Sequence, residues 1–486
     1  MKIIKSLKCR GLIFSLLFLT VIYYAEPASA GRGKRVREVV ILHVNDMHSR
    51  IDNLGKLAWL ADSLKVTHPY VFLVSAGDNF TGNPIVDMYP DNGYPMIDLM
   101  TKTGFNLSAI GNHEFDMGQD LQNKRRAQAN FPFICANMDV GESILHKPLP
   151  FVLLKAGKLK IPFLGFIQLG DKGWPDSHPS KLEGLSFVPA IEKAQEFMWL
   201  KKKYRMLIGL THLGVEGDEP LAQQYPQFDL IIGGHSHTTM KQAMMINNVM
   251  IVQAGSGLQN VGKTTLQFKG RKITGRNYEL IPLSAVTGIK PDIQQLIEKY
   301  NDNEAMDRVV GIASTPFSNK YELGCLMTDA ITGQFGLDFA FQNSGGIRIS
   351  SFPGGDITLT DIFRLDPFGN QVVTYSMTLD EIKSLIKYSF NKDKEVDLMV
   401  SGMIYTVIVD GNKECSDVEM TDYSGKAFDR GKKYKVGMNS YIAASYLFEH
   451  TDPGSTNSVT CSQTLIDYLL KIKTVSSEKN QRIFVK

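Results

Sequence analysis

Cysteine is scarce in this chain, and its spacing excludes sulfur-based metal chemistry. Five cysteines occur in 486 residues, and no two of them have the CxxC spacing of a thiolate metal cluster. Nothing in the sequence indicates a cysteine nucleophile either. In an exported protein Cys415 could pair with Cys461, but the sequence alone leaves that disulfide open.

Excess charge of one sign is also lacking, which argues against polyanionic partners. The chain carries 53 basic and 50 acidic residues, a net charge of +3 at pH 7. The first 30 residues account for that excess, so the remainder is close to neutral. The sequence therefore gives no electrostatic case for a nucleic-acid polymer or a membrane surface as a partner.

Beyond the first 30 residues no apolar run is long enough to cross a bilayer, so no stable membrane span is expected there. The start has basic residues up to Arg10, an apolar stretch over residues 11–24 and the small residues Ala28-Ser29-Ala30. This order is typical of a cleaved secretory signal over residues 1–30, and it predicts a periplasmic or secreted protein. An uncleaved membrane anchor is the alternative, although the apolar stretch is short for a span.

Five fragments with metal-binding side chains each follow a short apolar run in the first half of the chain. The runs are residues 39–44, 71–74, 107–110, 206–210 and 230–232, and they are predicted to be buried strands. Open α/β sheets build their sites beyond the carboxyl ends of such strands. The fragments are Asp46-Met47-His48, Gly77-Asp78-Asn79, Gly111-Asn112-His113-Glu114, Thr211-His212 and Gly234-His235-Ser236-His237.

These side chains predict a site for two divalent metal ions, such as zinc or manganese. Aspartate, asparagine and histidine are ligands of such ions, and sulfur is absent from the fragments. Asp78, in a tight turn, is the natural bridging ligand between two ions. A spacing of two residues is expected to put Asp46 with His48, and His235 with His237, on one side of an extended chain.

Paired ions of this kind hydrolyse phosphate esters. They lower the pKa of a bridging water towards about 7 and neutralise charge on phosphoryl oxygens. The leaving alkoxide then needs a proton. His113 directly follows the ligand Asn112, and Asp116 is placed to orient its ring, so His113 and Asp116 are the predicted catalytic residues.

Residues 257–264 match the Walker A pattern, but their context argues against a nucleotide-binding P-loop. That motif functions only where a helix follows the loop. The stretch over residues 264–283 instead alternates polar and apolar residues, with turns at Gly270 and Gly275, which predicts β structure.

In their order, the five fragments resemble the motif set of the calcineurin-type metallophosphoesterases. The string from Gly111 to Asp116 is closest to the exported 5′-nucleotidase and UDP-sugar hydrolase family. Several members of that family have glutamine at the position of His237. The resemblance implies that one ion is held by Asp46, His48, Asp78 and His237, and the other by Asp78, Asn112, His212 and His235.

The same resemblance implies the fold and domain organisation. The fold class is α/β, with a four-layer α/β/β/α metallophosphoesterase domain over residues 31–284. A smaller mixed α/β substrate-binding domain follows over residues 307–486. Residues 285–306 are the predicted connector, which includes a short helix capped by Asp292. Members of the family rotate their domains about this connector, so the same motion is expected here.

The second domain contains counterparts of the family's substrate-binding motifs. The string from Gln342 to Arg348 resembles the N-G-G-G-I-R signature, and Asp366 to Asn370 resembles the P-F-G-N turn. An arginine suits a phosphate contact, and two aromatic rings can stack on a base. The resemblance implies that the substrate is bound by Asn343, Arg348, Phe368, Asn370 and Tyr441.

This sequence departs from the family pattern at two places in the second domain. The aspartate that often follows the second aromatic residue is absent from residues 442–447. Only Lys320 stands where the family often has an arginine near a helix start. These departures put ribose recognition and part of the phosphate clamp in doubt, and they leave hydrolase chemistry untouched.

The sequence therefore predicts an exported phosphohydrolase that converts nucleoside 5′-monophosphates into nucleoside and phosphate through a metal-bound hydroxide. UDP-sugars and 2′,3′-cyclic nucleotides remain alternative substrates for the same machinery, and a sulfur or phosphate compound that is not a nucleotide is a weaker variant. A non-catalytic periplasmic binding protein is the alternative from a different class, and it would predict eroded ligands. The expected partner is a small nucleotide or phosphate ester.

Overall fold

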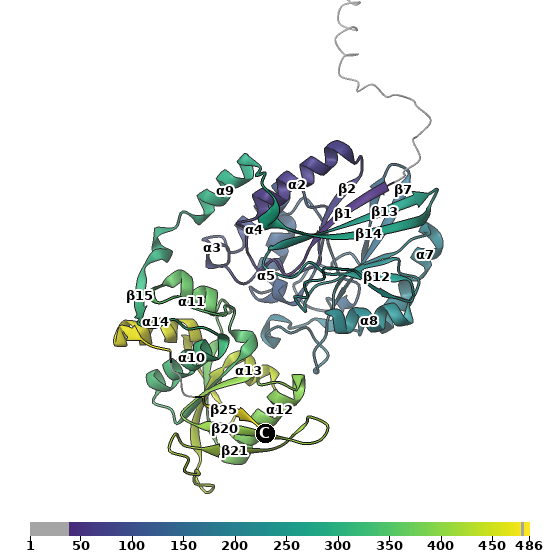
Figure 1. Ribbon diagram of the computed structural model, residues 1–486. Coiled ribbons are helices and arrows are strands. Elements are labelled where there is room, and N and C mark those ends of the chain that lie inside the picture. Colours follow the sequence, from purple (N-terminus) through teal and green to yellow (C-terminus); the bar gives the residue numbers. More distant parts are fainter. Residues whose placement is uncertain (1–37, 478–480) are drawn as a thin grey trace, which may run out of the picture.

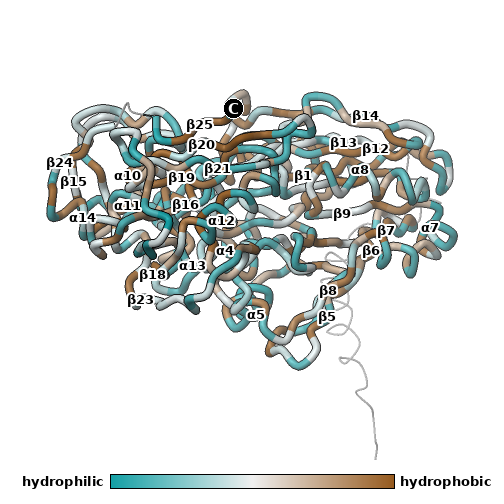
Figure 2. Tube along the Cα trace, turned by 90° about the horizontal axis from the view of Figure 1, so that it is seen from below, coloured by the Kyte–Doolittle hydropathy of each residue, from teal (hydrophilic) through white to brown (hydrophobic). Residues whose placement is uncertain are grey.

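Two domains lie side by side in the described part of the chain (Figure 1). The computed structural model describes residues 38–477 and 481–486. The predicted signal sequence, residues 1–30, lies outside these ranges. Figure 2 shows apolar segments running through both domains, with hydrophilic stretches on the outer loops. No helix in the described ranges has the length and apolar character that crossing a membrane requires.

The first sheet of the N-terminal domain contains three of the strands predicted to precede the site. Its order is β14-β13-β1-β2-β3-β4, with β1 to β4 parallel and β13 antiparallel to β1. The strands are β1 (Glu38–Val44), β2 (Val71–Ser75), β3 (Leu107–Ala109), β4 (Phe133–Ile134), β13 (Asn260–Lys269) and β14 (Lys272–Pro282). The Walker-like string leads into the β13–β14 hairpin, so the prediction of β structure there is confirmed.

The second sheet contains the other two predicted strands, in the order β11-β12-β10-β9-β7-β6. Its four inner strands are parallel, and the edge strands β6 and β11 are antiparallel. The strands are β6 (Phe151–Ala156), β7 (Leu159–Ile167), β9 (Ile208–His212), β10 (Leu230–Ile232), β11 (Met244–Ile246) and β12 (Val249–Val252). The strand predicted at residues 206–210 begins two residues later, so His212 is its last residue.

The two sheets pack face to face between helices, which confirms the predicted four-layer α/β/β/α fold. Ile41 and Val74 of the first sheet share a core with Phe163 and Ile208 of the second. Because strand residues alternate between faces, Leu42 points the other way, into a core with the outer helices. Those helices are α2 (Leu54–Thr67), α4 (Tyr94–Thr103) and α9 (Pro291–Asn301); α6 (Ala190–Ala194), α7 (Trp199–Tyr204) and α8 (Val215–Gln224) cover the second sheet.

Smaller elements complete the N-terminal domain. They are α3 (Pro84–Asp87), α5 (Gln119–Gln128) and the strand pair β5 (Met138–Asp139) and β8 (Ser186–Phe187). A 3-10 turn at Gln195–Phe197 separates α6 from α7. This break lets the rings of Phe197 and Trp199 both pack on Phe151.

The C-terminal domain is built on a five-stranded sheet in the order β19-β16-β22-β18-β23. Its strands are β16 (Phe339–Asn343), β18 (Gln371–Met377), β19 (Leu398–Ser401), β22 (Tyr434–Asn439) and β23 (Ser455–Thr460). Two three-stranded sheets consist of β15 (Val309–Ala313), β17 (Gly355–Thr358) and β24 (Thr474–Val475), and of β20 (Ile404–Val409), β21 (Cys415–Thr421) and β25 (Ile483–Val485). The domain is therefore mixed α/β.

Five helices pack on these sheets. They are α10 (Lys320–Phe335), α11 (Leu359–Leu365), α12 (Leu379–Asp393), α13 (Ser440–Ser445) and α14 (Cys461–Ile472). Asn319 caps α10 and Thr378 caps α12 through side-chain oxygens, which satisfies backbone N–H groups that a helix start leaves without partners. Cys415 and Cys461 are separate buried thiols, so the disulfide that the sequence left open is not formed.

The helix of the predicted connector packs on the N-terminal domain. Ile293, Ile297 and Tyr300 of α9 are buried in the core that α2 and α4 share. Asp292 does not cap this helix, contrary to expectation, because Pro291 takes its first position after Lys290. Beyond α9, residues 302–308 lead into β15. Domain rotation stays a prediction, and the packing of α9 would set its pivot after Asn301.

Candidate active site

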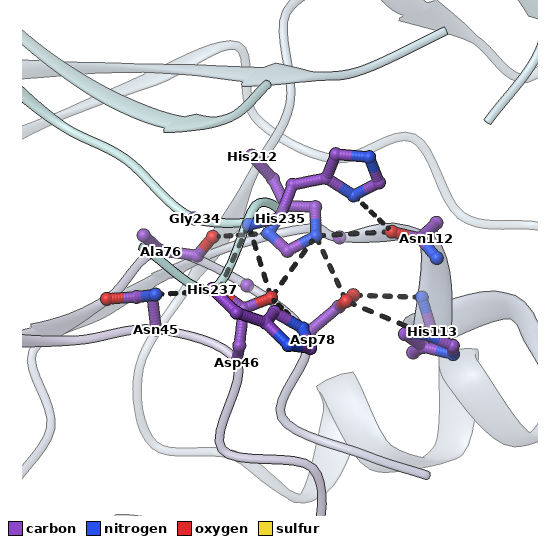
Figure 3. A network of polar contacts seen from close by, with 12 residues as sticks. Asn45, Asp46, Ala76, Asp78, Asn112, His113, His212, Gly234, His235 and His237 are labelled. Atoms are coloured by element: carbon purple, nitrogen blue, oxygen red, sulfur yellow. Dashed lines mark hydrogen bonds and ion pairs between the residues drawn. The ribbon is translucent and has the colours of Figure 1, made fainter. Parts of the chain in front are cut away.

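The carboxyl ends of β1, β2 and β3 in one sheet meet those of β9 and β10 in the other. Loops from the different strands are joined directly: the N–H of Asp46 donates to the carbonyl of Gly77, and the N–H of His48 donates to that of Asp78, both at 3.0 Å. Figure 3 shows side chains from all five sequence fragments pointing toward one another. Residues as far apart as 46 and 237 thus form one cluster.

Left-handed backbone, rather than extended chain, aims several of these side chains. The φ angles are +51° at Asp46, +49° at His48, +54° at Asp78, +81° at His235 and +54° at His237. The expectation that two-residue spacing on an extended chain aligns each pair is therefore wrong, and sharp turns do this instead. Such conformations cost roughly 1–3 kcal/mol each for residues other than glycine, and they concentrate at functional sites.

Two glycines allow the loops to touch. A Cβ atom on Gly111 would lie 2.2 Å from Oδ1 of Asp78, and one on Gly77 would lie 2.9 Å from Nδ1 of His212. Both approaches are too close for any other residue. The glycines that precede Asp78 and Asn112 therefore let these loops close around the cluster.

Asp46, His48 and His237 form the first group of candidate ligands. Nε2 of His237 lies 2.9 Å from Nε2 of His48 and 3.4 Å from Oδ1 of Asp46. The amide of Asn45 donates to Oδ2 of Asp46 at 2.6 Å, which leaves Oδ1 directed at the imidazoles. Nδ1 of His48 lies 3.1 Å from the carbonyl oxygen of Thr81, so Nε2 is the atom that it offers to the group.

Asp78, Asn112, His212 and His235 form the second group. Nε2 of His212 lies 3.0 Å from Oδ2 of Asp78 and 3.2 Å from Oδ1 of Asn112. Nδ1 of His235 lies 3.1 Å from the same asparagine oxygen. The groups adjoin, because ligand atoms of Asp46, Asp78 and His212 all lie within 4.8 Å of one another.

The buried carboxylates of this cluster need positive charge nearby. Asp46 and Asp78 are at most 1% exposed, and buried carboxylates need compensating positive charge. Burial would raise the pKa of Asp78, but the neighbouring His212 and His113 hold it well below its usual value. For His212, burial lowers the pKa, but the carboxylates of Asp78 and Asp46 outweigh burial and raise it to about 10. A proton on His212 thus supplies charge that a divalent ion would otherwise bring.

His48 and His235 have the protonation state that metal binding needs. Burial lowers the pKa of His48 well below its usual value and that of His235 to about 4. Both therefore present neutral rings with a free lone pair at neutral pH. Imidazole nitrogens and carboxylate or amide oxygens that converge in two adjoining groups fit two divalent ions of the zinc or manganese type.

His113 and Asp116 lie at the edge of the second group. Nδ1 of His113 is 2.6 Å from Oδ2 of Asp116, and its Nε2 is 3.8 Å from Oδ2 of Asp78. Burial lowers the pKa of His113, but the two carboxylates outweigh burial and raise it. A protonated ring in this position can stabilise charge on a phosphoryl oxygen or give a proton to a leaving group.

Glu114 is a site residue to which sequence reasoning assigned no role. Its Oε1 accepts from the backbone N–H and side-chain amide of Asn79 at 2.8 and 2.9 Å. Its Oε2 accepts from the N–H groups of Asp78 at 3.0 Å and Gly111 at 2.5 Å. The buried carboxylate therefore ties the Asp78 loop to the Asn112 loop. Its place inside the motif string was the signal that could have revealed it.

A cavity of about 460 Å³ between the domains opens onto both groups. Asp78, Asn112, His113, His235 and His237 line its N-terminal wall. All the C-terminal residues predicted to bind substrate line the opposite wall, namely Asn343, Arg348, Phe368, Asn370 and Tyr441. The structure thus brings the predicted substrate contacts to the mouth of the predicted metal site.

Arg348 spans the boundary between the domains. Its Nη2 lies 3.0 Å from Nε2 of His48, and its guanidinium carbon lies 5.6 Å from the centre of the Phe368 ring. Phe368 also stacks on His113, with ring centroids 5.7 Å apart and 28° between the planes. Lys320, the only cation offered where the family often has arginine, instead donates to the carbonyl of Ser344 at 3.4 Å.

The chain matches two family models, one in each domain. Residues 39–239 match the calcineurin-like phosphoesterase model, and residues 305–446 match the 5′-nucleotidase C-terminal domain model. The first range contains every candidate metal ligand, and the second contains every predicted substrate contact. The two matches together cover more than half of the chain.

Curated relatives and solved structures agree with these matches. A 5′-nucleotidase of Vibrio parahaemolyticus is 24% identical, over 92% of this chain and 91% of its own length. The trifunctional nucleotide phosphoesterase protein YfkN of Bacillus subtilis is 25% identical over 84% of this chain, which spans about a third (32%) of that larger protein. A 5′-nucleotidase precursor from Thermus thermophilus has the same fold, with a TM-score of 0.82, 22% identity, and coverage of 92% of this chain and 99% of its own. This chain belongs to the 5′-nucleotidase family, in which a calcineurin-like, metal-dependent phosphoesterase domain precedes a 5′-nucleotidase C-terminal domain.

Proposed function

We propose that this chain hydrolyses nucleoside 5′-monophosphates to nucleoside and phosphate with the help of two divalent ions. One observation carries the proposal: two groups of imidazoles and carboxylates converge on a cavity that also holds an arginine and two aromatic rings. The charged groups suit a phosphate, and the rings suit a flat base. Curated relatives named 5′-nucleotidase that cover over 90% of the chain support this substrate class.

The proposed metal ligands follow the two groups. Asp46, His48 and His237 would hold one ion, Asn112, His212 and His235 would hold the other, and Asp78 would bridge them. Bound ions would polarise the phosphoryl oxygens and lower the pKa of a coordinated water.

The chain's own residues would bind and orient the substrate. Arg348 reaches the first group from the C-terminal domain, so its planar guanidinium would bind two phosphate oxygens at once. Asn343 and Asn370 would contact the nucleoside, and Phe368 and Tyr441 would hold its base. His113, oriented by Asp116, would stabilise charge at the phosphoryl group and supply the proton for the leaving hydroxyl.

We extend the proposal to export and domain organisation. Residues 1–30 would direct the chain across a membrane and be removed. Residues 31–284 and 307–486 would act as the metallophosphoesterase and substrate-binding domains on either side of the connector, residues 285–306. Sequencing the amino terminus of the protein recovered from its source tests the cleavage, and a chain that retains residues 1–30 would contradict it.

A substrate panel with and without a chelator tests the activity. We expect phosphate release from nucleoside 5′-monophosphates, at least about tenfold faster than from UDP-glucose, 2′,3′-cyclic nucleotides or sugar phosphates. Chelation should abolish it, and added manganese or zinc should restore it. Faster turnover of UDP-glucose or a cyclic nucleotide would reassign the substrate. A well-folded protein that binds about two ions per chain and hydrolyses none of these esters would reject the proposal.

A further inference from the structure

The segment from Gln168 to His178 lies against the second metal group, although it belongs to none of the five sequence fragments. It begins where β7 ends, beside the last residue of β9. Ile167 pairs with His212 in the sheet, and the N–H of Gln168 donates to the His212 carbonyl at 2.8 Å. Gln168 is therefore fixed relative to the backbone of a proposed ligand.

Gln168 holds Asp176 through two hydrogen bonds. Its Nε2 donates to Oδ2 of Asp176 at 2.5 Å, and its Oε1 accepts from the N–H of Asp176 at 3.3 Å. The turn between them is tight, because the N–H of Gly170 donates to the carbonyl of Trp174 at 2.8 Å. A Cβ atom on Gly170 would lie 2.7 Å from Oδ1 of Asp176, so the turn brings the Gly170 backbone close to that carboxylate.

Asp176 contacts two further ligands of the second group, Asn112 and His235. Its carbonyl oxygen accepts from Nδ2 of Asn112 at 3.0 Å. That bond fixes which way the asparagine amide points, and it leaves Oδ1 facing the imidazoles of His212 and His235. The carboxylate of Asp176 also lies 3.7 Å from Nε2 of His235, so the opposite ring nitrogen, Nδ1, is the one turned into the group.

We propose that Gln168 and Asp176 form a positioning pair that orients Asn112 and His235 for the second ion. This inference rests on the ligand assignments of the proposed function. Residues behind metal ligands fix the direction of the ligands' lone pairs, and their loss typically weakens metal binding about 10- to 100-fold. The first group is held by other partners, Asn45 and the carbonyl of Thr81, so the pair should serve one ion selectively.

Manganese binding to the full-length chain tests the pair. Equilibrium dialysis against Mn²⁺ should give two dissociation constants for the wild type. Asp176→Ala and Gln168→Ala should each raise one of them by about 10- to 100-fold and leave the other unchanged. His235→Ala removes a ligand outright, and it identifies which constant belongs to the second ion. Asp171→Ala, an exposed aspartate in the same segment, should change neither.

Electron paramagnetic resonance and thermal unfolding separate positioning from general support of the fold. At two Mn²⁺ per chain the wild type should show the signal of a spin-coupled pair, and the Asp176 and Gln168 variants should show that of an isolated ion. The Tm of each variant without metal should equal that of the wild type. The inference would be overturned if both Mn²⁺ dissociation constants of the variants were unchanged. It would also be overturned if both rose equally and the Tm without metal fell. A wild type that binds two ions without nucleotidase activity would reject the proposed function alone, and one that binds fewer than two ions would reject both.

Discussion

Nη2 of Arg348 lies 3.0 Å from Nε2 of His48, although 300 residues separate the two in sequence. Through this contact the C-terminal domain reaches the first metal group directly. The same guanidinium lies over the ring of Phe368, which in turn stacks on His113. Arg348, the proposed phosphate contact, therefore touches both the metal site and Phe368, the ring proposed to hold the base.

Replacement of Arg348 should weaken binding of the transition state more than binding of the substrate. Arg348→Ala is expected to lower kcat/KM for a nucleoside monophosphate by about 100- to 1,000-fold, the usual effect of removing one charge-stabilising donor. The kcat/KM of Arg348→Lys should fall between those of the wild type and Arg348→Ala, because lysine keeps the charge and loses the planar fork. Steady-state kinetics measure both. Arg430→Ala, on an exposed loop of the same domain, is the control, and a loss equal to that of Arg348→Ala would contradict the assignment.

His113 should act on turnover without holding metal. Its Nδ1 contacts Asp116 at 2.6 Å, so only Nε2 is free, and in the proposed function this atom would face the reacting phosphate. His113→Ala should lower kcat at least about a hundredfold, and Asp116→Asn should lower it less. Elemental analysis should find the same metal content in both variants as in the wild type. A parallel loss of metal and turnover would make His113 a ligand.

Strands, helices and ligand types could be predicted from this sequence, since each has a local cause. The apolar runs predicted β1, β2, β3 and β10 within a residue or so, because a buried parallel strand needs continuous apolar side chains. The direction of Asp46 and His48 could not be predicted. It arises from left-handed turns, which depend on contacts with the loop around Asp78, and no local pattern encodes them.

The residues that support the ligands could not be predicted from the sequence for a related reason. Asp176 and Gln168 follow β7, whose carboxyl end carries no metal-binding motif, and only the pairing of β7 with β9 brings them beside His212. Similarly, the packing of α9 on α2 and α4 depends on the approach of segments at least 188 residues apart in sequence, the separation of Thr103 from Pro291. Such placements are set by tertiary structure, so residue types and spacing give no signal for them.

Glu114 should matter for the folding of the site before any metal binds. Each of its oxygens accepts two hydrogen bonds, from Asn79, Asp78 and Gly111. Glu114→Gln replaces one acceptor with an amide that faces two donors, and buried polar groups without partners cost about 1–3 kcal/mol each. We expect the free energy of unfolding, measured by urea denaturation with chelator present, to fall by roughly 2–4 kcal/mol. Glu142→Gln, at an exposed position, should change it little.

Asp366 should make stability depend on pH at a distance from the metal groups. This carboxyl is 2% exposed, and burial raises its pKa to about 7, although the backbone N–H groups of Phe368 and Ser462 favour the charged form. An acid with a raised pKa in the folded state stabilises the fold at low pH. That contribution is lost as pH rises from the ordinary value of 3.8 to about 7.

Asp366→Asn removes this ionisation while keeping the size of the side chain. Because one pKa unit corresponds to about 1.4 kcal/mol, the variant should gain up to roughly 4 kcal/mol over the wild type at pH 8. Near pH 4.5, where the wild-type carboxyl is protonated in the folded state, the two proteins should have similar Tm values. Thermal unfolding across this range measures the difference, and Asp356→Asn, an exposed residue of the same domain, is the control. A difference in Tm that stays constant with pH would show that the pKa of Asp366 is not raised in the folded protein.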